Sequence, residues 1–344
     1  MKRRRFLVVS TMAAVAGMAG RSMAEEPASA STRGIILYPF DLTLADWPER
    51  AARAGLTTIG LHAARRLDVL VKFVQSDQGQ QFIERCRKLG LQVEYELHAM
   101  GDLLSREYIS QDMSMFRVDA SGQRNADFNC CPSHPRALEL IAEAAVEYAK
   151  LLTPTTHRFF YWPDDGREWC HCDKCRGLSA SEQALLVEHA MLDALRKHHD
   201  PEAMVCHIAY GPTLEAPRQV QPHPGVFLEY APIRRQHDRP FEQQRDLPLV
   251  DRLDMLDANL EVFPRDTTQV LEYWLDVSRF SAWQRPAVKL PWHPEVLQAD
   301  LESYRRRGIQ HITSFACFID ADYVRLHGDP QPVLMEYGEA LRGK

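Results

Sequence analysis

The stretch from residue 158 to residue 166, RFFYWPDDG, joins a mostly apolar run to two adjacent carboxylates and a glycine. A short apolar run of this kind is typical of a strand that is buried on both faces, as in a parallel sheet. In a barrel of parallel strands, functional side chains gather where the strands end and the loops begin. The stretch therefore predicts both a strand of parallel sheet and the place of an active site.

Strand-like and helix-like segments alternate on both sides of this stretch, which is the pattern of a parallel β/α architecture. We predict one α/β domain, a (β/α)8 TIM-type barrel, over residues 34–344. Its predicted strands are residues 34–40, 57–62, 92–98, 158–162, 204–210, 226–230, 269–274 and 311–318. Its predicted helices are residues 47–54, 80–89, 135–152, 181–197, 247–262 and 332–341. Residues 287–292 also have a strand pattern, and we interpret them as an insertion outside the eight strands.

Two connections depart from the regular alternation. Residues 99–135 form a long polar segment after the third strand, and loops of this length usually serve function, so we expect it to fold over the barrel mouth. Residues 211–225 contain four prolines and no helical pattern. The barrel should therefore be irregular between its fifth and sixth strands, without the usual crossover helix.

The N-terminus carries a targeting pattern. Residues 3–7 match the twin-arginine motif, an alanine-rich apolar stretch follows, and residues 22–24 fit a small-x-small cleavage site. Residues 1–24 are therefore predicted to be a twin-arginine-type signal peptide, and residues 25–33 a polar tether. Export by the twin-arginine machinery predicts a periplasmic or secreted protein. The apolar stretch is too short for a confident membrane span. We expect no stable membrane span after the signal is cleaved.

The composition is that of an ordinary globular protein. The chain has 344 residues, of which 45% are hydrophobic and 26% charged, with a formal net charge of −6. Nucleic-acid binding needs a basic surface, and this mild acidity gives no support for it.

Carboxylates at the predicted strand ends indicate glycoside chemistry. Glycoside hydrolysis needs one protonated and one ionised carboxyl group on either side of the scissile bond. Asp164 and Asp165 are adjacent, and their mutual repulsion favours a proton on one of them. Glu229 and Glu272 each lie within an otherwise apolar strand, where an unpaired charge is costly, so we expect both to face the polar axis near the barrel mouth.

Aromatic and histidine side chains near the strand ends complete the prediction of a sugar-binding cleft. Sugar rings stack on aromatic planes, and histidines can hydrogen-bond sugar hydroxyls. Packing in the core is the competing interpretation for each of these side chains. The substrate-binding candidates are His62, Glu96, His98, Trp162, Tyr210, Tyr230, Trp274, Trp292 and His293.

Three of the eight cysteines form a C-x-C-x-x-C cluster: Cys170, Cys172 and Cys175. Three thiols cannot all pair with one another, whereas tetrahedral zinc would take all three and a fourth ligand. Cys131 or its neighbour Cys130 is best placed as that ligand, with the histidine inside the cluster in reserve, and we predict Cys131. Because four protein ligands would close the site, the prediction is a structural zinc. Disulfides formed after export are the alternative.

With these residues, the chain resembles a bacterial family of exported proteins of unassigned function, thought to carry a glycosidase-like barrel and remotely similar to α-glucuronidases and β-hexosaminidases. The resemblance covers residues 94–98, 129–133, 162–175 and 227–232. In the hexosaminidases an adjacent acid pair ends the fourth strand, and its second member donates the proton. The resemblance implies that role for Asp165, with Asp164 as its partner, although those enzymes have the longer glutamate at the second position. In the α-glucuronidases the acids sit on several strands, as Asp165, Glu229 and Glu272 do here.

These observations predict an exported glycoside hydrolase-like enzyme that acts on an oligosaccharide, with Asp165 as general acid and Glu229 or Glu272 as nucleophile or base. Two alternatives remain open. A sugar-isomerase-type barrel would bind a divalent metal through carboxylates and a histidine at strand ends, here Glu94, Asp165, His207 and Glu229. A barrel that binds sugar without catalysis is the other alternative.

Overall fold

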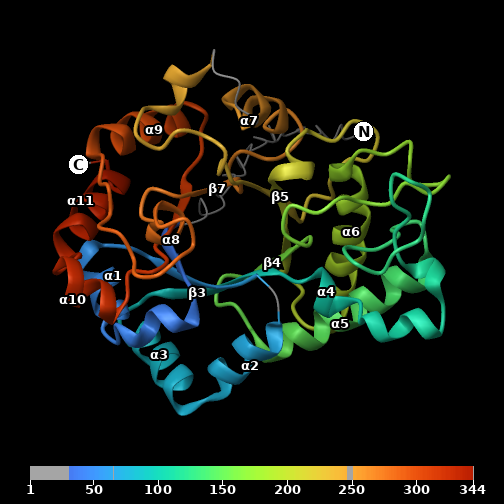
Figure 1. Cartoon of the computed structure of the whole chain (residues 1–344), viewed down its shortest axis with the longest axis horizontal. Helices are drawn as coiled ribbons and strands as arrows, with labels where there is room; N and C mark the ends of the chain where they lie inside the picture. The colour runs from blue at the N-terminus through green and yellow to red at the C-terminus, as the bar shows by residue number, and fades with distance from the viewer. Residues whose placement is uncertain (1–30, 65, 246–250, 344) are drawn as a thin grey trace, which may run out of the picture. The chain divides into compact units, whose positions relative to one another are not determined.

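A closed ring of eight parallel strands forms the centre of the protein. The computed structural model describes residues 31–64, 66–245 and 251–343. The strands pair in chain order, and β8 closes the ring on β1 (Figure 1). They are β1 (Arg33–Leu37), β2 (Thr58–Ala63), β3 (Gln92–His98), β4 (Arg158–Trp162), β5 (Met204–Ala209), β6 (Val226–Tyr230), β7 (Gln269–Glu272) and β8 (His311–Phe315). The predicted (β/α)8 barrel is confirmed. The predicted signal peptide and residues 25–30 of the tether lie outside the described residues.

The helices lie around the ring of strands (Figure 1). They are α1 (Trp47–Ala54), α2 (Leu67–Gln75), α3 (Asp77–Lys88), α4 (Met100–Leu103), α5 (Pro135–Leu151), α6 (Ala180–His198), α7 (Leu253–Asn259), α8 (Val277–Phe280), α9 (Pro294–Arg306), α10 (Ala321–His327) and α11 (Gln331–Leu341). The sequence pattern missed α2, α9 and α10, and also the short helices α4 and α8. The helix predicted at residues 247–262 is shorter, and residues 247–250 of it lie outside the described residues.

Local signals explain where the correctly predicted helices begin and end. The hydroxyl of Ser179 accepts a hydrogen bond from the Glu182 backbone N–H, and the Glu182 carboxylate accepts one from the Ser179 N–H, which caps α6. At the C-terminus of α1, Gly55 ends the helix with a φ of 74°, a left-handed conformation that suits glycine.

Three segments depart from the regular alternation of strands and helices. Residues 287–292 form no strand, because a closed ring has no free edge for a ninth one. Between β5 and β6 the chain forms only a short 3-10 turn, η4 (Gly211–Thr213), in place of a crossover helix. The loop of residues 99–135 contains α4 and short turns, and α4 packs on α5.

The barrel interior has a charged layer below its aromatic layer. Glu94, Glu96 and Glu229 share this layer with one guanidinium, that of Arg158, and all four side chains are almost fully buried. Gln269 donates a hydrogen bond to Glu229 (Nε2 to Oε1, 2.8 Å) and accepts one from Arg158 (3.2 Å). Burial raises the pKa of Glu229 to about 8. Burial and the charge of Glu229 also raise the pKa of Glu96 well above its ordinary value. At neutral pH the layer therefore holds protons that these groups would release in water.

Substituting Glu229→Gln should reduce the pH dependence of stability. The pKa of Glu229 rises from its ordinary value of 4.5 to about 8 on folding, so the folded protein holds a proton that the unfolded chain has lost within that window. The contribution of Glu229 to the free energy of unfolding is therefore largest below about pH 4.5. It falls as the pH rises to about 8, with a slope of up to about 1.4 kcal/mol per pH unit. Urea unfolding at several pH values should show a shallower slope for Glu229→Gln.

The control for this comparison is Glu302→Gln on the exposed surface of α9, which should leave the slope of the wild type unchanged. Equal slopes in the wild type and in Glu229→Gln would contradict the assignment of a buried, protonated Glu229.

Candidate active site and thiolate cluster

A pocket opens where the strands end, and every strand contributes to its wall. Its cavity has a volume of about 130 Å³. The lining residues are Tyr38, His62, Ala64, His98, Trp162, Asp165, Ile208, Tyr210, Ile233, Leu271, Tyr273, Asp276, Ser278, Trp283, Phe315 and Cys317. The C-terminal rim of the barrel is thus the candidate active site, as in other barrels of this type.

Two carboxylates line this pocket, Asp165 after β4 and Asp276 after β7. The side chain of Asp165 is half exposed. Its Oδ1 accepts a hydrogen bond from the Tyr210 hydroxyl at 3.0 Å and lies 3.8 Å from His98 Nε2. The two acids therefore sit in different environments, because Asp276 is almost fully buried.

Asp276 is the N-cap of α8. Its Oδ1 accepts hydrogen bonds from the Ser278 hydroxyl at 2.5 Å and from the Arg279 backbone N–H at 3.3 Å. Burial outweighs these bonds and raises the pKa of Asp276 above its ordinary value. Burial therefore favours the protonated form of the Asp276 carboxyl.

Two histidines in the pocket wall are held by backbone carbonyls. Nδ1 of His62 lies 2.7 Å from the carbonyl oxygen of Glu96, and Nδ1 of His98 lies 2.7 Å from that of Pro163. A carbonyl only accepts, so each Nδ1 carries the proton. Burial lowers the pKa of His62 to about 3, so this ring is neutral at pH 7 and its Nε2 is an acceptor.

Aromatic residues make up half of the remaining lining residues. The Trp162 ring lies 5.5 Å from His62 and 5.0 Å from His98, measured between ring centroids. Tyr38 stacks on Phe40 at 4.9 Å. Burial, followed by the neighbouring Cys317, raises the pKa of Tyr38, so its hydroxyl keeps its proton and can donate. The wall combines flat apolar faces with a few oriented polar groups, the combination that a sugar ring needs.

Of the residues singled out from the sequence, Asp165, His62, His98, Trp162 and Tyr210 line this pocket. Glu96 and Glu229 do not, because they belong to the charged layer of the interior. Glu96 stands two residues before His98, which lines the pocket, and Glu229 stands four residues before Ile233, which also lines it. The expectation that Glu229 reaches the mouth is wrong. Its side chain faces the barrel axis, but in the charged layer below the pocket.

Glu272 points out of the barrel, and its predicted position at the mouth is wrong. Its neighbours Leu271 and Tyr273 line the pocket, and side chains along a strand alternate between faces. Outside, its carboxylate lies 3.1 Å from Arg235 Nη2 and accepts a hydrogen bond from the Tyr304 hydroxyl at 2.5 Å. This fully buried ion pair joins β7 to α9 and to the segment after β6.

The other aromatic candidates also lie away from the pocket. Trp274 donates to Asp300 on α9 (3.1 Å), and the Tyr230 hydroxyl donates to the Arg252 carbonyl (2.7 Å). Trp292 donates to Glu336 on α11 (2.7 Å), and His293 is the N-cap residue of α9. Core packing or helix attachment explains each of these four side chains.

Asp164 attaches a loop to the end of β4. It accepts hydrogen bonds from the backbone N–H groups of Gly101 (3.1 Å) and Asn129 (2.7 Å), and from the Arg106 guanidinium (3.2 Å). None of residues 99–135 lines the pocket, so the expectation that this loop covers the mouth is also corrected. It lies beside the mouth, joined to the connection after β4.

Asp276, Tyr38, Tyr273 and Trp283 line the pocket although sequence reasoning did not select them. Asp276 was missed because the predicted strand ran to residue 274, whereas β7 ends at Glu272. The available signal was the Asp-x-Ser spacing of residues 276–278, which is typical of a helix N-cap.

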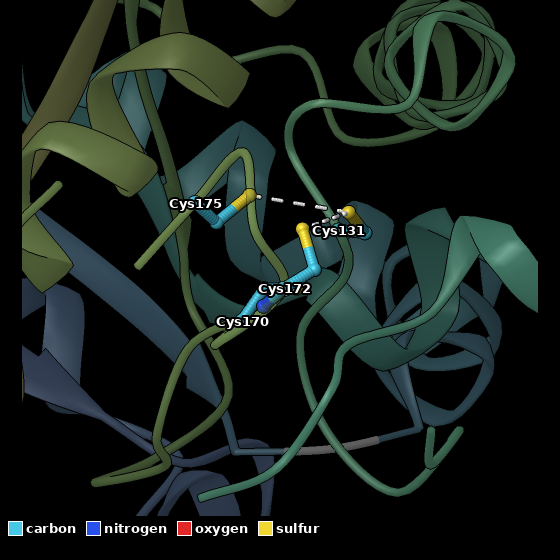
Figure 2. A group of neighbouring side chains, drawn as sticks. All are labelled: Cys131, Cys170, Cys172 and Cys175. Atoms are coloured by element: carbon cyan, nitrogen blue, oxygen red, sulfur yellow. Dashed lines mark hydrogen bonds between the residues drawn. The ribbon is translucent and has the colours of Figure 1, made fainter. Parts of the chain in front are cut away.

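Four cysteine sulfurs converge beside the pocket: those of Cys131, Cys170, Cys172 and Cys175 lie within 4.8 Å of one another. Cys131 Sγ is 3.7 Å from that of Cys172 and 4.0 Å from that of Cys175, and Figure 2 shows these three turned toward one another. With Zn–S bonds of about 2.3 Å, a tetrahedral site separates its sulfurs by about 3.8 Å. A disulfide would need about 2.0 Å, and all four thiols are free. The predicted ligand set thus fits a tetrahedral metal.

The surroundings of the cluster support thiolate ligands. The backbone N–H groups of Val118 and Cys172 point at Cys170 Sγ, at 3.3 and 3.5 Å. The Gln183 side chain on α6 accepts from the Cys170 N–H at 3.0 Å and donates to the Cys170 carbonyl at 3.1 Å. Cys130 is not part of the group, and burial raises the pKa of its thiol.

The metal ligands that an isomerase-type barrel would need do not come together. His207 lies outside the barrel, where Nδ1 is 2.9 Å from Glu188 on α6 and the ring stacks on Phe263 at 5.1 Å. Glu94 and Glu229 belong to the charged interior layer. Within the described part of the chain, the four cysteines are the one group found that could hold a metal.

The fold and the pocket together define a glycosidase-like (β/α)8 barrel with a cluster of four cysteines. The chain belongs to the DUF4838 family, described as a domain of unknown function, which matches residues 66–316. No curated protein matches the sequence. None of the described helices is both long and apolar enough to cross a membrane.

Two solved β-galactosidases share the fold, and a solved mannosidase shows a weaker likeness. The β-galactosidase of the psychrophilic Marinomonas ef1 has a TM-score of 0.55 at 10% identity, over 90% of this chain and 59% of that one. The cold-adapted β-galactosidase of Rahnella sp. R3 has a TM-score of 0.50 at 14% identity, over 92% and 56%. The exo-β-1,4-mannosidase Op5Man5 of Opitutaceae bacterium strain TAV5 has a TM-score of 0.47 at 14% identity, over 91% and 59%. The chain spans less than two thirds of each, and at these identities the likeness concerns the fold.

Purified protein should contain one zinc ion per chain, and Cys172→Ser should lower the metal content at least tenfold. Removing one thiolate leaves an incomplete tetrahedron, and the loss of the metal should also lower the melting temperature. Elemental analysis and calorimetry measure both effects. Cys130→Ala is the matched control, because Cys130 is buried next to Cys131 but lies outside the cluster, and it should keep the metal. Metal-free protein whose mass shows disulfides would contradict the site.

Proposed function

We propose that this protein is a glycoside hydrolase that cleaves an oligosaccharide with Asp165 and Asp276 as its two carboxyl groups. One observation carries the proposal: these two acids line a single pocket whose walls are aromatic. The likeness to glycoside hydrolases adds support at the level of the fold alone. Glu229 and Glu272 have no part in this proposal, since neither lines the pocket.

Asp276 acts as the proton donor and Asp165 as the base or nucleophile. Burial raises the pKa of Asp276, which favours the protonated form that a donor needs. Asp165 is half exposed and oriented by the Tyr210 hydroxyl, as suits a carboxylate that attacks or that activates water. This reverses the role of Asp165 that the resemblance to hexosaminidases implies.

The proposed reaction is hydrolysis in which the bond between the anomeric carbon and the leaving oxygen breaks. Asp276 gives its proton to the leaving oxygen. Water supplies a hydroxyl to the anomeric carbon and a proton that returns to the carboxyl pair. The neutral His62 ring and the Tyr38 hydroxyl would respectively accept from and donate to sugar hydroxyls.

The cysteine cluster has a structural part in this proposal. None of its four residues lines the pocket, so a bound zinc would cross-link two loops and take no direct part in the reaction. The twin-arginine pattern further supports action in the periplasm or outside the cell, with the metal bound before export.

Asp165→Asn and Asp276→Asn should each lower kcat/KM for an oligosaccharide by about a thousandfold, within the usual range for general acid–base groups. A leaving group of low pKa needs no proton, so Asp276→Asn should lose much less activity on a dinitrophenyl glycoside, whereas Asp165→Asn should lose activity on both. Steady-state kinetics with the best substrates of a glycoside panel measure this. Asp322→Asn on the exposed surface of α10 is the control. Full activity of either pocket variant, or sugar binding without any product in the wild type, would contradict the proposal.

The sugar should be uncharged. Among the described residues no lysine or arginine lines the pocket, while two aspartates do, so the carboxylate of a uronic acid would meet negative charge without a cation to pair with it. We expect kcat/KM for aryl hexosides to exceed that for the matching aryl uronides at least tenfold. Comparable or faster hydrolysis of the uronides would overturn this prediction.

A further inference from the structure

Trp283 is exposed to an unusual degree for a pocket residue. It is 63% exposed, the highest value among the large hydrophobic side chains of the described residues, yet it belongs to the pocket wall. Within the described chain, its indole has neither a hydrogen bond nor a ring contact. A large apolar side chain that is mostly exposed in a pocket wall is typical of a binding surface.

The backbone at Trp283 is held in a sparsely populated conformation. Ala282 and Trp283 have φ values of 51° and 56°, in the left-handed region that costs a non-glycine residue about 1 kcal/mol or more. The turn is maintained by hydrogen bonds from the Trp283 N–H to the Ser278 carbonyl (2.7 Å) and from the Ala282 N–H to the Arg279 carbonyl (3.0 Å). Such strain persists where the surroundings impose it, and here it holds an indole at the pocket mouth.

The same connection after β7 carries the proposed proton donor. Asp276 caps α8 through the Arg279 N–H, and Ser278 both donates to Asp276 and accepts from the Trp283 N–H. Hydrogen bonds through Ser278 and Arg279 thus link the Asp276 carboxyl to the turn that carries the Trp283 indole. No long flexible segment lies between them. Asp276 and Trp283 thus come from the same connection and line the same pocket.

We propose that Trp283 is the stacking platform of a second sugar-binding subsite, which holds the leaving sugar. This inference rests on the proposed function, because the donor carboxyl must face the leaving oxygen, and the leaving sugar must then lie on the donor's side. The pocket would hold the sugar whose anomeric bond breaks, and the C–H face of the next ring would lie on the indole. The substrate is therefore a disaccharide or longer oligosaccharide.

The test compares two substrates with the same sugar in the pocket, a disaccharide and the corresponding methyl glycoside. The ratio of kcat/KM for the disaccharide to that for the methyl glycoside should fall about tenfold in Trp283→Ala, because only the disaccharide has a ring to stack. Trp283→Phe keeps an aromatic face and should recover most of the ratio. Trp292→Phe, outside the pocket, should leave it unchanged. An unchanged ratio in Trp283→Ala would overturn the platform.

A binding experiment separates this inference from the proposed function. Titration calorimetry with wild type and Trp283→Ala measures affinity for the disaccharide and the methyl glycoside without any need for turnover. If the wild type hydrolyses neither but Trp283→Ala weakens disaccharide binding alone, the platform stands and the hydrolase proposal fails. If both proteins bind the two ligands with the same relative affinity, the platform is wrong whether or not the wild type is active.

Discussion

The closure of eight parallel strands into one ring is the constraint on which the rest of this protein depends. A closed parallel ring brings all the C-terminal strand ends to one rim, and the two-residue period of a strand decides which side chains face inward there. On β7 this period turns Leu271 and Tyr273 into the pocket and Glu272 out of it. Asp276 reaches the pocket because it lies beyond the strand, where α8 begins and the alternation no longer applies.

The end of β4 depends on a second set of contacts, which are polar. Asp164 accepts backbone hydrogen bonds from the loop of residues 99–135, and the Asp164 N–H donates to the Asn129 side chain at 2.8 Å. Asn129 also donates to the carbonyls of Arg167 and Glu168, and two residues later Cys131 joins the thiolate cluster. The adjacent acids thus have separate tasks. Asp164 attaches the loop, which leaves Asp165 free to face the pocket.

The interior combines a polar lower layer with an aromatic upper layer. Glu229 and Arg158 are buried among hydrogen-bond partners of the lower layer, whereas Trp162 and Phe315 line the pocket. Burial favours the neutral form in both layers. It raises the pKa of Glu229, which keeps that carboxyl protonated, and lowers the pKa of His62, which keeps that ring unprotonated. The pocket therefore has neutral polar groups around a small number of acids, which suits a ligand that is itself uncharged.

The sequence by itself determined the barrel, the missing helix between β5 and β6, and the four cysteines that come together. Each of these is encoded by local signals: apolar runs, prolines, helix caps and a tight cysteine spacing. It also identified Asp165 and both pocket histidines, because they stand at or just after strand ends. Only the tertiary structure decided which of the other acids share the pocket. Glu229 lies below the pocket, Glu272 faces outward and Asp276 turns inward. These positions depend on where each strand ends and on the register of its neighbours. Pairing between segments far apart in the chain sets both.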